Sequence, residues 1–187
     1  SSRNATVQAL IKTLQARDFI TEGHARRLNE YAQLLGASLG LPAERLNDLQ
    51  LLAQFHDLGK VGVPDRILFK PARLTEEEFE VMKRHCEIGH RITRSLTDLA
   101  AISDFILKHH ERWDGSGYPL GLSGEDIPLE SRILAIVDAF DTMTSQRPYK
   151  PAMSREEALE ELKRNAGTQF DPNLVGKAVE VLRNGAE

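Results

Sequence analysis

Apolar residues recur at intervals of three and four along most of this 187-residue chain, and this spacing constrains its fold more than any other feature. Side chains three and four residues apart share one face of an α-helix, so the pattern predicts amphipathic helices that each bury one face. No segment shows the alternation of apolar and polar residues that indicates a β-strand. We therefore predict an all-α fold, a compact bundle of several helices.

Helix starts and loops are marked by residues that commonly begin or interrupt regular structure. Capping side chains precede three of the predicted helices, namely Thr75 with Glu78, Ser154 with Glu157, and Asp171 before Pro172. Glycine and proline concentrate in two stretches, Gly59 to Pro64 and Asp114 to Pro128. These two stretches are predicted to be loops.

Composition limits the class of protein. With 41% hydrophobic and 28% charged residues, the chain suits one globular domain with a sizeable core rather than a disordered segment. A formal net charge of −4, without a long run of either sign, argues against binding to duplex nucleic acid or to an anionic membrane. The lone cysteine, Cys86, and the lack of any membrane-spanning or signal-peptide stretch point to a cytoplasmic protein.

The amino-terminal residues carry a narrow apolar stripe, formed by Val7, Leu10, Ile11 and Leu14. The stripe begins without a convincing N-cap, so we predict that residues 1–18 form a helix that continues an upstream linker. Residues 19–187 are predicted to form the main domain. The stripe fits either a seam between two helices of a homodimer or packing against the domain's own core.

Histidine and aspartate recur where the apolar pattern points inward: His24, His56, Asp57, His85, His109, His110, Asp138 and Asp141. His56 follows Leu52 by four residues on one helical face. Phe105 precedes His109 by four residues and Ile106 precedes His110 by four, so one predicted helix carries both of these imidazoles toward the core. Burying such groups is costly unless something compensates them, so the set implies a bound cation.

The types of ligand indicate the kind of metal and the kind of chemistry. Imidazole nitrogen and carboxylate oxygen favour iron, manganese, cobalt, nickel or zinc over calcium or magnesium. Two divalent ions roughly 3.5–4 Å apart can activate water and neutralise the charge of a phosphodiester during in-line attack. The ligand set therefore suits metal-assisted hydrolysis of a phosphoester.

At these positions the sequence resembles a known family. His24, the His56–Asp57 pair and Asp138 are similar to the tetrad of the HD phosphohydrolase superfamily. Longer motifs resemble its HD-GYP group, namely HDLGK at 56–60, His85 with Gly89, HHERWDGSGYP at 109–119 and DAFDTMTSQRPYK at 138–150. The resemblance implies an all-helical HD domain with a glycine-rich GYP loop, and it makes residues 19–187 the catalytic domain. The implied activity is hydrolysis of the bacterial second messenger cyclic di-GMP to linear pGpG, with GMP as a further product.

The resemblance also assigns roles residue by residue. The implied metal ligands are His56, Asp57, His85, His109, His110 and Asp138, with Asp57 bridging two divalent ions. The implied catalytic residues are Lys60, Asp57 and Asp141. The implied substrate contacts are Arg147, Lys150, Tyr118 and His24. Iron and manganese are the metals that the family favours, and zinc, nickel and cobalt are alternatives.

One position departs from the family pattern. Members with three metals carry a glutamate four residues before the histidine that matches His24, and this chain has Ile20 there. Because isoleucine cannot bind a metal, we predict a two-metal centre in which His24 is a peripheral ligand or a substrate contact. Without a third ion to hold the terminal phosphate of pGpG, this product is predicted to accumulate.

Other interpretations remain open for three residues. Lys60 could instead interact with the carboxyl end of its helix, where a cation is favourable. Cys86 could be a soft metal ligand or, as we expect, a small buried hydrophobic residue. His90 is predicted to lie away from the metal, because it is about 140° from His85 around the helix.

Three functions fit the sequence. The favoured one is a cyclic di-GMP phosphodiesterase. The second is an HD-type phosphohydrolase that acts on another cyclic dinucleotide or on a nucleotide, and the third is a catalytically weak cyclic di-GMP receptor or docking module. The expected partners are the cyclic dinucleotide, an upstream sensory or receiver domain, a second copy in a homodimer, and partner domains docked through the GYP loop.

Overall fold

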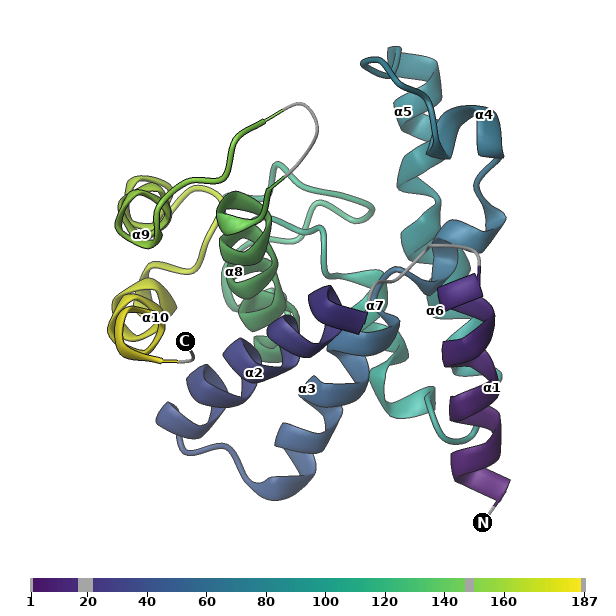
Figure 1. Cartoon of the computed structure of the whole chain (residues 1–187), viewed down its shortest axis with the longest axis horizontal. Coiled ribbons are helices and arrows are strands. Elements are labelled where there is room, and N and C mark those ends of the chain that lie inside the picture. Colours follow the sequence, from purple (N-terminus) through teal and green to yellow (C-terminus); the bar gives the residue numbers. More distant parts are fainter. Residues whose placement is uncertain (1, 17–21, 147–149, 186–187) are drawn as a thin grey trace.

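The computed structural model describes residues 2–16, 22–146 and 150–185, which form an all-α domain (Figure 1). The α-helices are α1 Ser2–Ala16, α2 Glu22–Ser38, α3 Ala43–Phe55, α4 Asp65–Leu68, α5 Glu76–Lys83, α6 His85–Arg94, α7 Ser103–Leu107, α8 Leu129–Thr144, α9 Arg155–Arg164 and α10 Pro172–Asn184. The 3₁₀ helices are η1 Leu58–Gly62, η2 Ala100–Ile102 and η3 Gly124–Asp126. The described residues contain no β-sheet, so the predicted all-α class is confirmed.

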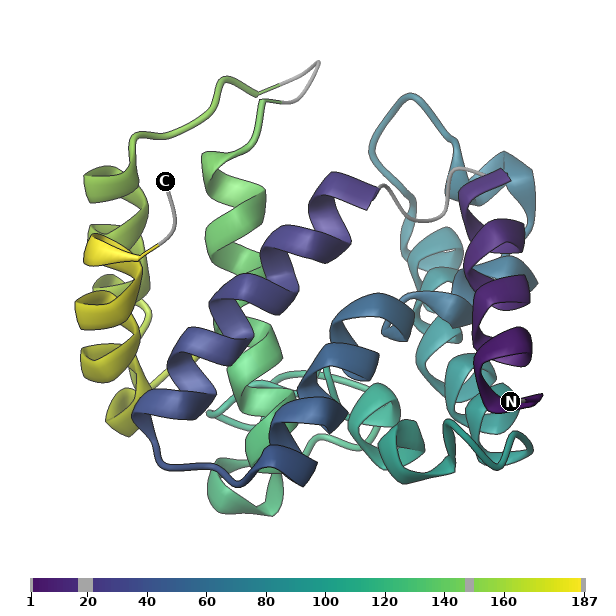
Figure 2. The same cartoon turned by 60° about the horizontal axis from the view of Figure 1, so that its bottom comes forward.

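Helices α2, α3 and α8 form the centre of the bundle. Helix α2 packs against both α3 and α8, while α9 and α10 cover the outer side of α2 and α8 (Figures 1 and 2). On the opposite side, α6 packs against η1 and α7. Leu35, Leu52 and Phe55 are fully buried between these elements, and the rings of Tyr31 and Phe140 meet edge to face with centroids 5.2 Å apart. Burial of this apolar surface, worth about 25 cal/mol per Å², fixes the relative positions of the elements that carry the candidate ligands.

The helix starts read from the sequence are confirmed. Reciprocal hydrogen bonds between side chains and backbone close capping boxes at Thr75 with Glu78 and at Ser154 with Glu157. The Asp171 side chain accepts a hydrogen bond from the Asn173 N–H at the start of α10. These contacts are local, which explains why sequence spacing alone could predict them.

The prediction that one helix carries both imidazoles of the His109–His110 pair is wrong. Helix α7 ends at Leu107, and the two histidines lie in the turn that follows it. Adjacent side chains on a helix diverge by about 100°. In this turn, by contrast, the two ring centroids lie only 4.2 Å apart, so both rings can face the same space.

The stretch from Gly59 was predicted to be a loop, but it starts within the 3₁₀ helix η1. A Cβ atom at Gly59 would lie 1.8 Å from the carbonyl oxygen of His85, so glycine is required where η1 touches α6. The prediction was wrong because this glycine serves a close contact between segments and not a loop. The other predicted loop, Asp114 to Pro128, is irregular apart from η3.

Helix α1 lies beside α6 in both views (Figures 1 and 2). Leu14 is buried in the domain core and Leu10 is partly buried against it, which supports packing on the domain itself. The side chains of Val7 and Ile11, and the boundary predicted at residue 18, lie outside the described residues. The homodimer stays a prediction. None of the described helices has the length and apolar character needed to cross a bilayer.

Candidate metal centre

Asp57 lies at the centre of the site, where α3 gives way to η1. Its Oδ2 atom is 3.3 Å from Nε2 of His56. Its Oδ1 atom is 3.8 Å from Nε2 of His85 and 3.9 Å from Nε2 of His109. Three segments that are distant in the sequence therefore converge on one carboxylate.

The backbone holds three of these histidines in one tautomer. Nδ1 of His56, His85 and His109 lies within 3.0 Å of the carbonyl oxygen three residues earlier in each case. A carbonyl oxygen can only accept, so each Nδ1 donates, and in the neutral rings of His85 and His109 the Nε2 atom keeps its lone pair. Nε2 of His109 is buried and has no hydrogen-bond partner among the described residues. Buried lone pairs that face a carboxylate fit a metal site, because an ion would satisfy them.

The candidate ligands form two groups, and within each group the donor atoms lie within 4.8 Å of one another. The first group is His85, Cys86, His109 and His110, and the second is His24, His56 and Asp138. Either group has enough nitrogen and oxygen donors to hold a divalent transition metal. Asp57 contacts His56 from the second group as well as His85 and His109 from the first.

The electrostatic environment of the candidate ligands sets their protonation states. Burial lowers the pKa of His85 and of His110, and it lowers the pKa of His109 to about 4, so these imidazoles are neutral at pH 7. Burial alone would raise the pKa of Asp57, but His56 and Lys60 outweigh it and hold that pKa well below its ordinary value. Burial alone would lower the pKa of His56, but Asp57 outweighs it and raises that pKa, so a metal that binds Nε2 of His56 would displace a proton. Neutral imidazoles and an ionised carboxylate are the protonation states that bind metals.

Lys60 belongs to the site. Its Nζ atom lies 3.1 Å from Oδ2 of Asp57, one turn along η1. Its ammonium group therefore neutralises part of the carboxylate charge while remaining partly open to solvent. In this position it could also reach a phosphate group bound beside Asp57.

Asp141 is buried and is held by two basic side chains from α2. Its Oδ2 atom accepts a hydrogen bond from Nδ1 of His24 at 2.6 Å, and its Oδ1 atom accepts one from Nε of Arg27 at 2.6 Å. Nε2 of His24 is then turned toward Asp138, 3.5 Å from its Oδ1 atom. Hydrogen bonds to Asp138 and Asp141 raise the pKa of His24 to about 9. Sequence reasoning missed Arg27, although its position one turn after His24 was a signal.

Tyr118 lies directly on the metal-ligand cluster. Its ring stacks on that of His110, with centroids 5.0 Å apart and an interplanar angle of 15°. Phe79 meets Tyr118 edge to face, and Nζ of Lys83 lies 5.4 Å from the centre of the Tyr118 ring. An aromatic and cationic wall therefore borders the site. Phe79 and Lys83 on α5 were not predicted from the sequence.

The glycine-rich loop is fastened by a buried carboxylate that the sequence analysis also missed. Glu111 accepts hydrogen bonds from the backbone N–H groups of Leu120, Gly121 and Leu122, at 2.6, 3.0 and 3.1 Å. Gly117 packs so closely that an added Cβ would lie 2.5 Å from the carbonyl oxygen of His110. These contacts explain why the loop needs glutamate and glycine to hold Tyr118 against the ligands.

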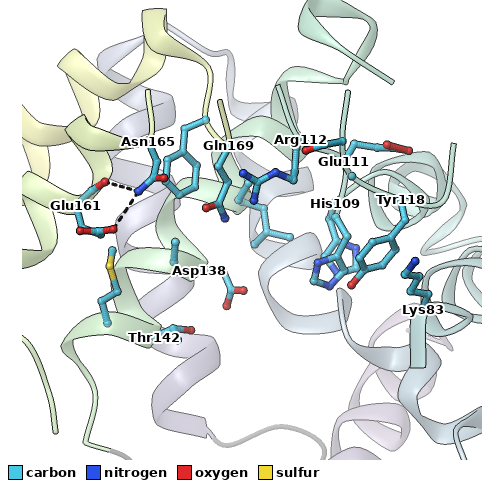
Figure 3. A pocket seen from close by; sticks show the side chains of 18 of the residues that line it. Lys83, His109, Glu111, Arg112, Tyr118, Asp138, Thr142, Glu161, Asn165 and Gln169 are labelled. Carbon is cyan, nitrogen blue, oxygen red and sulfur yellow. Dashed lines mark hydrogen bonds between the residues drawn. The ribbon is translucent and has the colours of Figure 1, made fainter. Parts of the chain in front are cut away.

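A cleft of about 670 Å³ opens beside the cluster, and Figure 3 shows its side chains. Asp138, His109, Tyr118 and Lys150 are among the predicted residues that line it. Its wall also includes residues that the sequence analysis did not select, chiefly Lys83, Arg112, Glu161, Asn165 and Gln169. The last three come from the region around the end of α9, more than 20 residues beyond Asp138, and no local pattern connects them with the ligands.

The other candidate residues are placed as follows. Lys150 is exposed at the cleft, whereas Arg147 and Ile20 lie outside the described residues. His90 is turned to the backbone, with Nδ1 donating to the Ser103 carbonyl at 3.0 Å, which supports the predicted structural role. Cys86 is fully buried, and burial raises the pKa of its thiol to about 12, in keeping with a small buried hydrophobic residue.

Comparison with protein families gives a match to the HD domain over residues 8–174. Among curated proteins, the chain is 43% identical over 172 residues to the cyclic di-GMP phosphodiesterase response regulator RpfG of Xanthomonas campestris pv. campestris. That alignment covers 91% of this chain and 46% of the relative. The chain is also 39% identical over 171 residues to the 3'3'-cGAMP-specific phosphodiesterase 2 of Vibrio cholerae, covering 90% of this chain and 33% of that protein. This chain therefore spans about half or less of the length of these relatives.

Solved structures with the same fold include the cyclic GMP-AMP specific phosphodiesterase V-cGAP3 of V. cholerae, with a TM-score of 0.68 and 24% identity over 86% of this chain and 44% of that one. A second is the HDG"Y"P protein Bd1817 of Bdellovibrio bacteriovorus, with a TM-score of 0.69 and 18% identity over 98% of this chain and 64% of that one. At these identities the likeness establishes the fold alone.

Proposed function

The chain belongs to the HD domain family and carries the motifs of its HD-GYP group, and from this premise we propose that it is a metal-dependent phosphodiesterase that hydrolyses cyclic di-GMP to linear pGpG. Relatives that bear the name cyclic di-GMP phosphodiesterase support the substrate. We also propose an upstream sensory or receiver domain in the whole protein, a proposal supported by the relative RpfG, which bears the name response regulator. Its proposed place of action is the bacterial cytoplasm.

The proposed centre holds two divalent ions through His56, Asp57, His85, His109, His110 and Asp138, with Asp57 shared between them. The observation that carries this proposal is the buried Nε2 atom of His109, which faces Asp57 without a hydrogen-bond partner among the described residues. Bound ions would supply the acidity that activates water and the charge that neutralises a phosphodiester. Iron or manganese is proposed, although the donor set also suits zinc, nickel and cobalt.

The side chains around the centre are proposed to orient the substrate and the ligands. Lys60 would donate hydrogen bonds to a phosphate oxygen while it keeps Asp57 ionised. Asp141 would act through His24, since its carboxylate accepts a hydrogen bond from Nδ1–H of that ring and so directs Nε2 toward Asp138. In this arrangement His24 is a peripheral ligand or contacts the substrate from beside Asp138.

Binding of a dianionic substrate to an acidic chain requires local cations. Lys60, Arg147 and Lys150 are proposed to meet the phosphates, and Lys83 and Arg112 add positive charge along the cleft. Tyr118 offers an aromatic face on which a base can stack, because every nucleobase has a π-face. The cleft volume of about 670 Å³ is adequate for a small nucleotide ligand.

The main product is proposed to be pGpG. A second cut would require a flexible linear molecule with an additional terminal phosphate to bind again, and Ile20 deprives a third ion of a carboxylate ligand. A second candidate substrate is another cyclic dinucleotide, because some relatives bear the name 3'3'-cGAMP-specific phosphodiesterase. A catalytically weak receptor or docking module, with partners bound through the GYP loop, is the remaining alternative.

Turnover by the metal-loaded chain tests the proposal. Protein purified anaerobically and supplied with Fe²⁺ or Mn²⁺ is expected to convert cyclic di-GMP to pGpG, with GMP appearing late or not at all on chromatography. Cyclic di-GMP that binds but is never cleaved would indicate a receptor. GMP as the main product from the first time points would refute the inference drawn from Ile20.

A further inference from the structure

The cleft beside the proposed metal centre has two chemically different ends (Figure 3). The first end is aromatic and cationic, with Lys83 and Tyr118 and with Phe79 packed against Tyr118. The second end carries amide and carboxylate groups, from Glu161, Asn165 and Gln169. Asp138 lies between the two ends. The second end, called here the amide end, has no part in the proposed metal binding or hydrolysis.

Two hydrogen-bond acceptors lie side by side at the amide end. Nδ2 of Asn165 donates to the backbone oxygen of Glu161 at 2.9 Å and to its Oε1 atom at 3.2 Å. This geometry occupies the donors of the Asn165 amide and leaves its Oδ1 atom as an acceptor, to which no described residue donates. Oε2 of Glu161 pairs with Arg164, but a carboxylate has about four acceptor positions and can accept further hydrogen bonds.

The side-chain amide of Gln169 adds a hydrogen-bond donor to the amide end. Figure 3 shows the side chain of Gln169 in the cleft beside Arg112, facing the space between Asn165 and the metal ligands. Its amide supplies both N–H donors and an acceptor. The amide end therefore presents two neighbouring acceptors with a donor close by.

The backbone fixes these groups in place. The turn from Asn165 to Phe170 is closed by a hydrogen bond from the Phe170 N–H to the Asn165 oxygen at 3.2 Å. It is also tied to the glycine-rich loop, because the Asp114 N–H donates to the Thr168 oxygen at 2.9 Å. Phe170 is buried and anchors the turn in the core. Groups fixed in this way lose little further freedom when they bind a ligand, so their hydrogen bonds favour specificity.

We propose that Glu161, Asn165 and Gln169 form a subsite that reads the Watson–Crick edge of one guanine of the substrate. That edge presents two adjacent donors, N1–H and N2–H₂, beside the acceptor O6. The donors match the Glu161 carboxylate and Asn165 Oδ1, and O6 matches the Gln169 amide. Adenine would place the lone pair of its N1 atom against the same acceptors, which is unfavourable. This inference rests on the proposed cyclic dinucleotide substrate and names the base that the site selects.

The aromatic end cannot provide this discrimination. Stacking on Tyr118 and Phe79 accepts any base, because it uses the π-face and not the edge. The cleft would therefore read only one of the two bases of a cyclic dinucleotide. A mixed guanine–adenine dinucleotide can place its guanine at the amide end in one of two orientations, so it should bind only about twofold more weakly than cyclic di-GMP. Cyclic di-AMP should be weaker than both by roughly tenfold or more.

The test compares cyclic di-GMP, 3'3'-cGAMP and cyclic di-AMP on the metal-loaded chain. Specificity is measured as kcat/KM for any compound that is cleaved and as a calorimetric Kd for any that binds without cleavage. Glu161→Gln is expected to reduce the preference for cyclic di-GMP over cyclic di-AMP by about tenfold, since it exchanges a charged acceptor for a neutral amide. The matched control is Glu160→Gln, an exposed neighbour that pairs with Lys163, and it should leave the preference unchanged.

Gln169→Ala is a second variant, and it should also reduce the preference for cyclic di-GMP over cyclic di-AMP. The inference is overturned if Glu161→Gln and Gln169→Ala keep the wild-type ratio, if wild type does not distinguish the three compounds, or if 3'3'-cGAMP behaves like cyclic di-AMP. Guanine-selective binding without any cleavage would support the subsite and refute the proposed phosphodiesterase activity. If the chain neither binds nor cleaves any of the three compounds, both the subsite and the proposed phosphodiesterase activity are refuted.

Discussion

The pair formed by His24 and Asp141 predicts a specific dependence of stability on pH in the metal-free protein. Hydrogen bonds to Asp138 and Asp141 raise the pKa of His24 from 6.5 to about 9. A raised pKa in the folded state means that protonated His24 stabilises the fold. This contribution is fully present below pH 6.5 and is lost as the pH rises through about 9.

The size of the effect follows from the same values. Raising a pKa from 6.5 to about 9 corresponds to about 3 kcal/mol, at 1.36 kcal/mol per pKa unit. The side chain of His24 is 27% exposed, so solvent screens part of this energy and we expect about 1–3 kcal/mol. His24→Gln removes the titrating ring while keeping a polar side chain, and the pH-dependent contribution should disappear with it.

Urea unfolding of the chelator-treated protein from pH 6 to pH 9.5 measures this contribution. Wild type should lose its stability advantage over His24→Gln between pH 6.5 and 9.5, so the two free energies of unfolding should converge as the pH rises. The control is His90→Gln. Nδ1 of His90 donates to the backbone carbonyl of Ser103 and not to a carboxylate, so this change should not produce the same convergence. A constant difference between wild type and His24→Gln across this range would refute the ion-pair account of His24.

Three further predictions concern the loop, the packing and the substrate. Glu111→Ala leaves the N–H groups of Leu120, Gly121 and Leu122 without their acceptor, so we expect about 2–4 kcal/mol of destabilisation and faster proteolysis within the glycine-rich loop; unchanged stability would contradict this. Gly59→Ala forces a Cβ into the His85 carbonyl, so it should lower the melting temperature sharply and weaken metal binding. The control is Gly176→Ala in α10, where the added Cβ meets open space, and it should be neutral or slightly stabilising. Arg147→Ala should weaken cyclic di-GMP binding roughly tenfold without changing metal content, and an unaltered calorimetric Kd would remove Arg147 from the site.

Local features of the fold could be predicted from the sequence because their causes are local. The capping boxes at Thr75 and Ser154 depend on residues three positions apart, and both are confirmed. The all-α class follows from periodicity that persists along the chain. The end of α7 at Leu107 could not be predicted, because Ile106 and His110 keep helical spacing although the chain has already turned.

Parts of the site were predictable for a different reason. The convergence of His56, His85 and His109 on Asp57 agrees with the motifs that the sequence shares with its family. Arg27 and Glu111 form contacts that no spacing rule specifies, since Arg27 reaches Asp141 across more than 100 residues. The amide end of the cleft was missed because Glu161 on α9 and Gln169 in the turn after it reach the same cleft as the ligands only through tertiary packing, including that of α9 against α8.

The central claim is that the cluster around Asp57 binds two metal ions, and elemental analysis tests it most directly. Wild type purified anaerobically, or reloaded with Fe²⁺ or Mn²⁺ and desalted, is expected to retain about two equivalents of metal. Asp57→Asn should lose most of the metal from both positions, because the carboxylate contacts ligands of both groups. Asp65→Asn, an exposed change in α4, should retain the wild-type content. Wild type with well under one equivalent of every transition metal, and unable to take up more, would contradict the account.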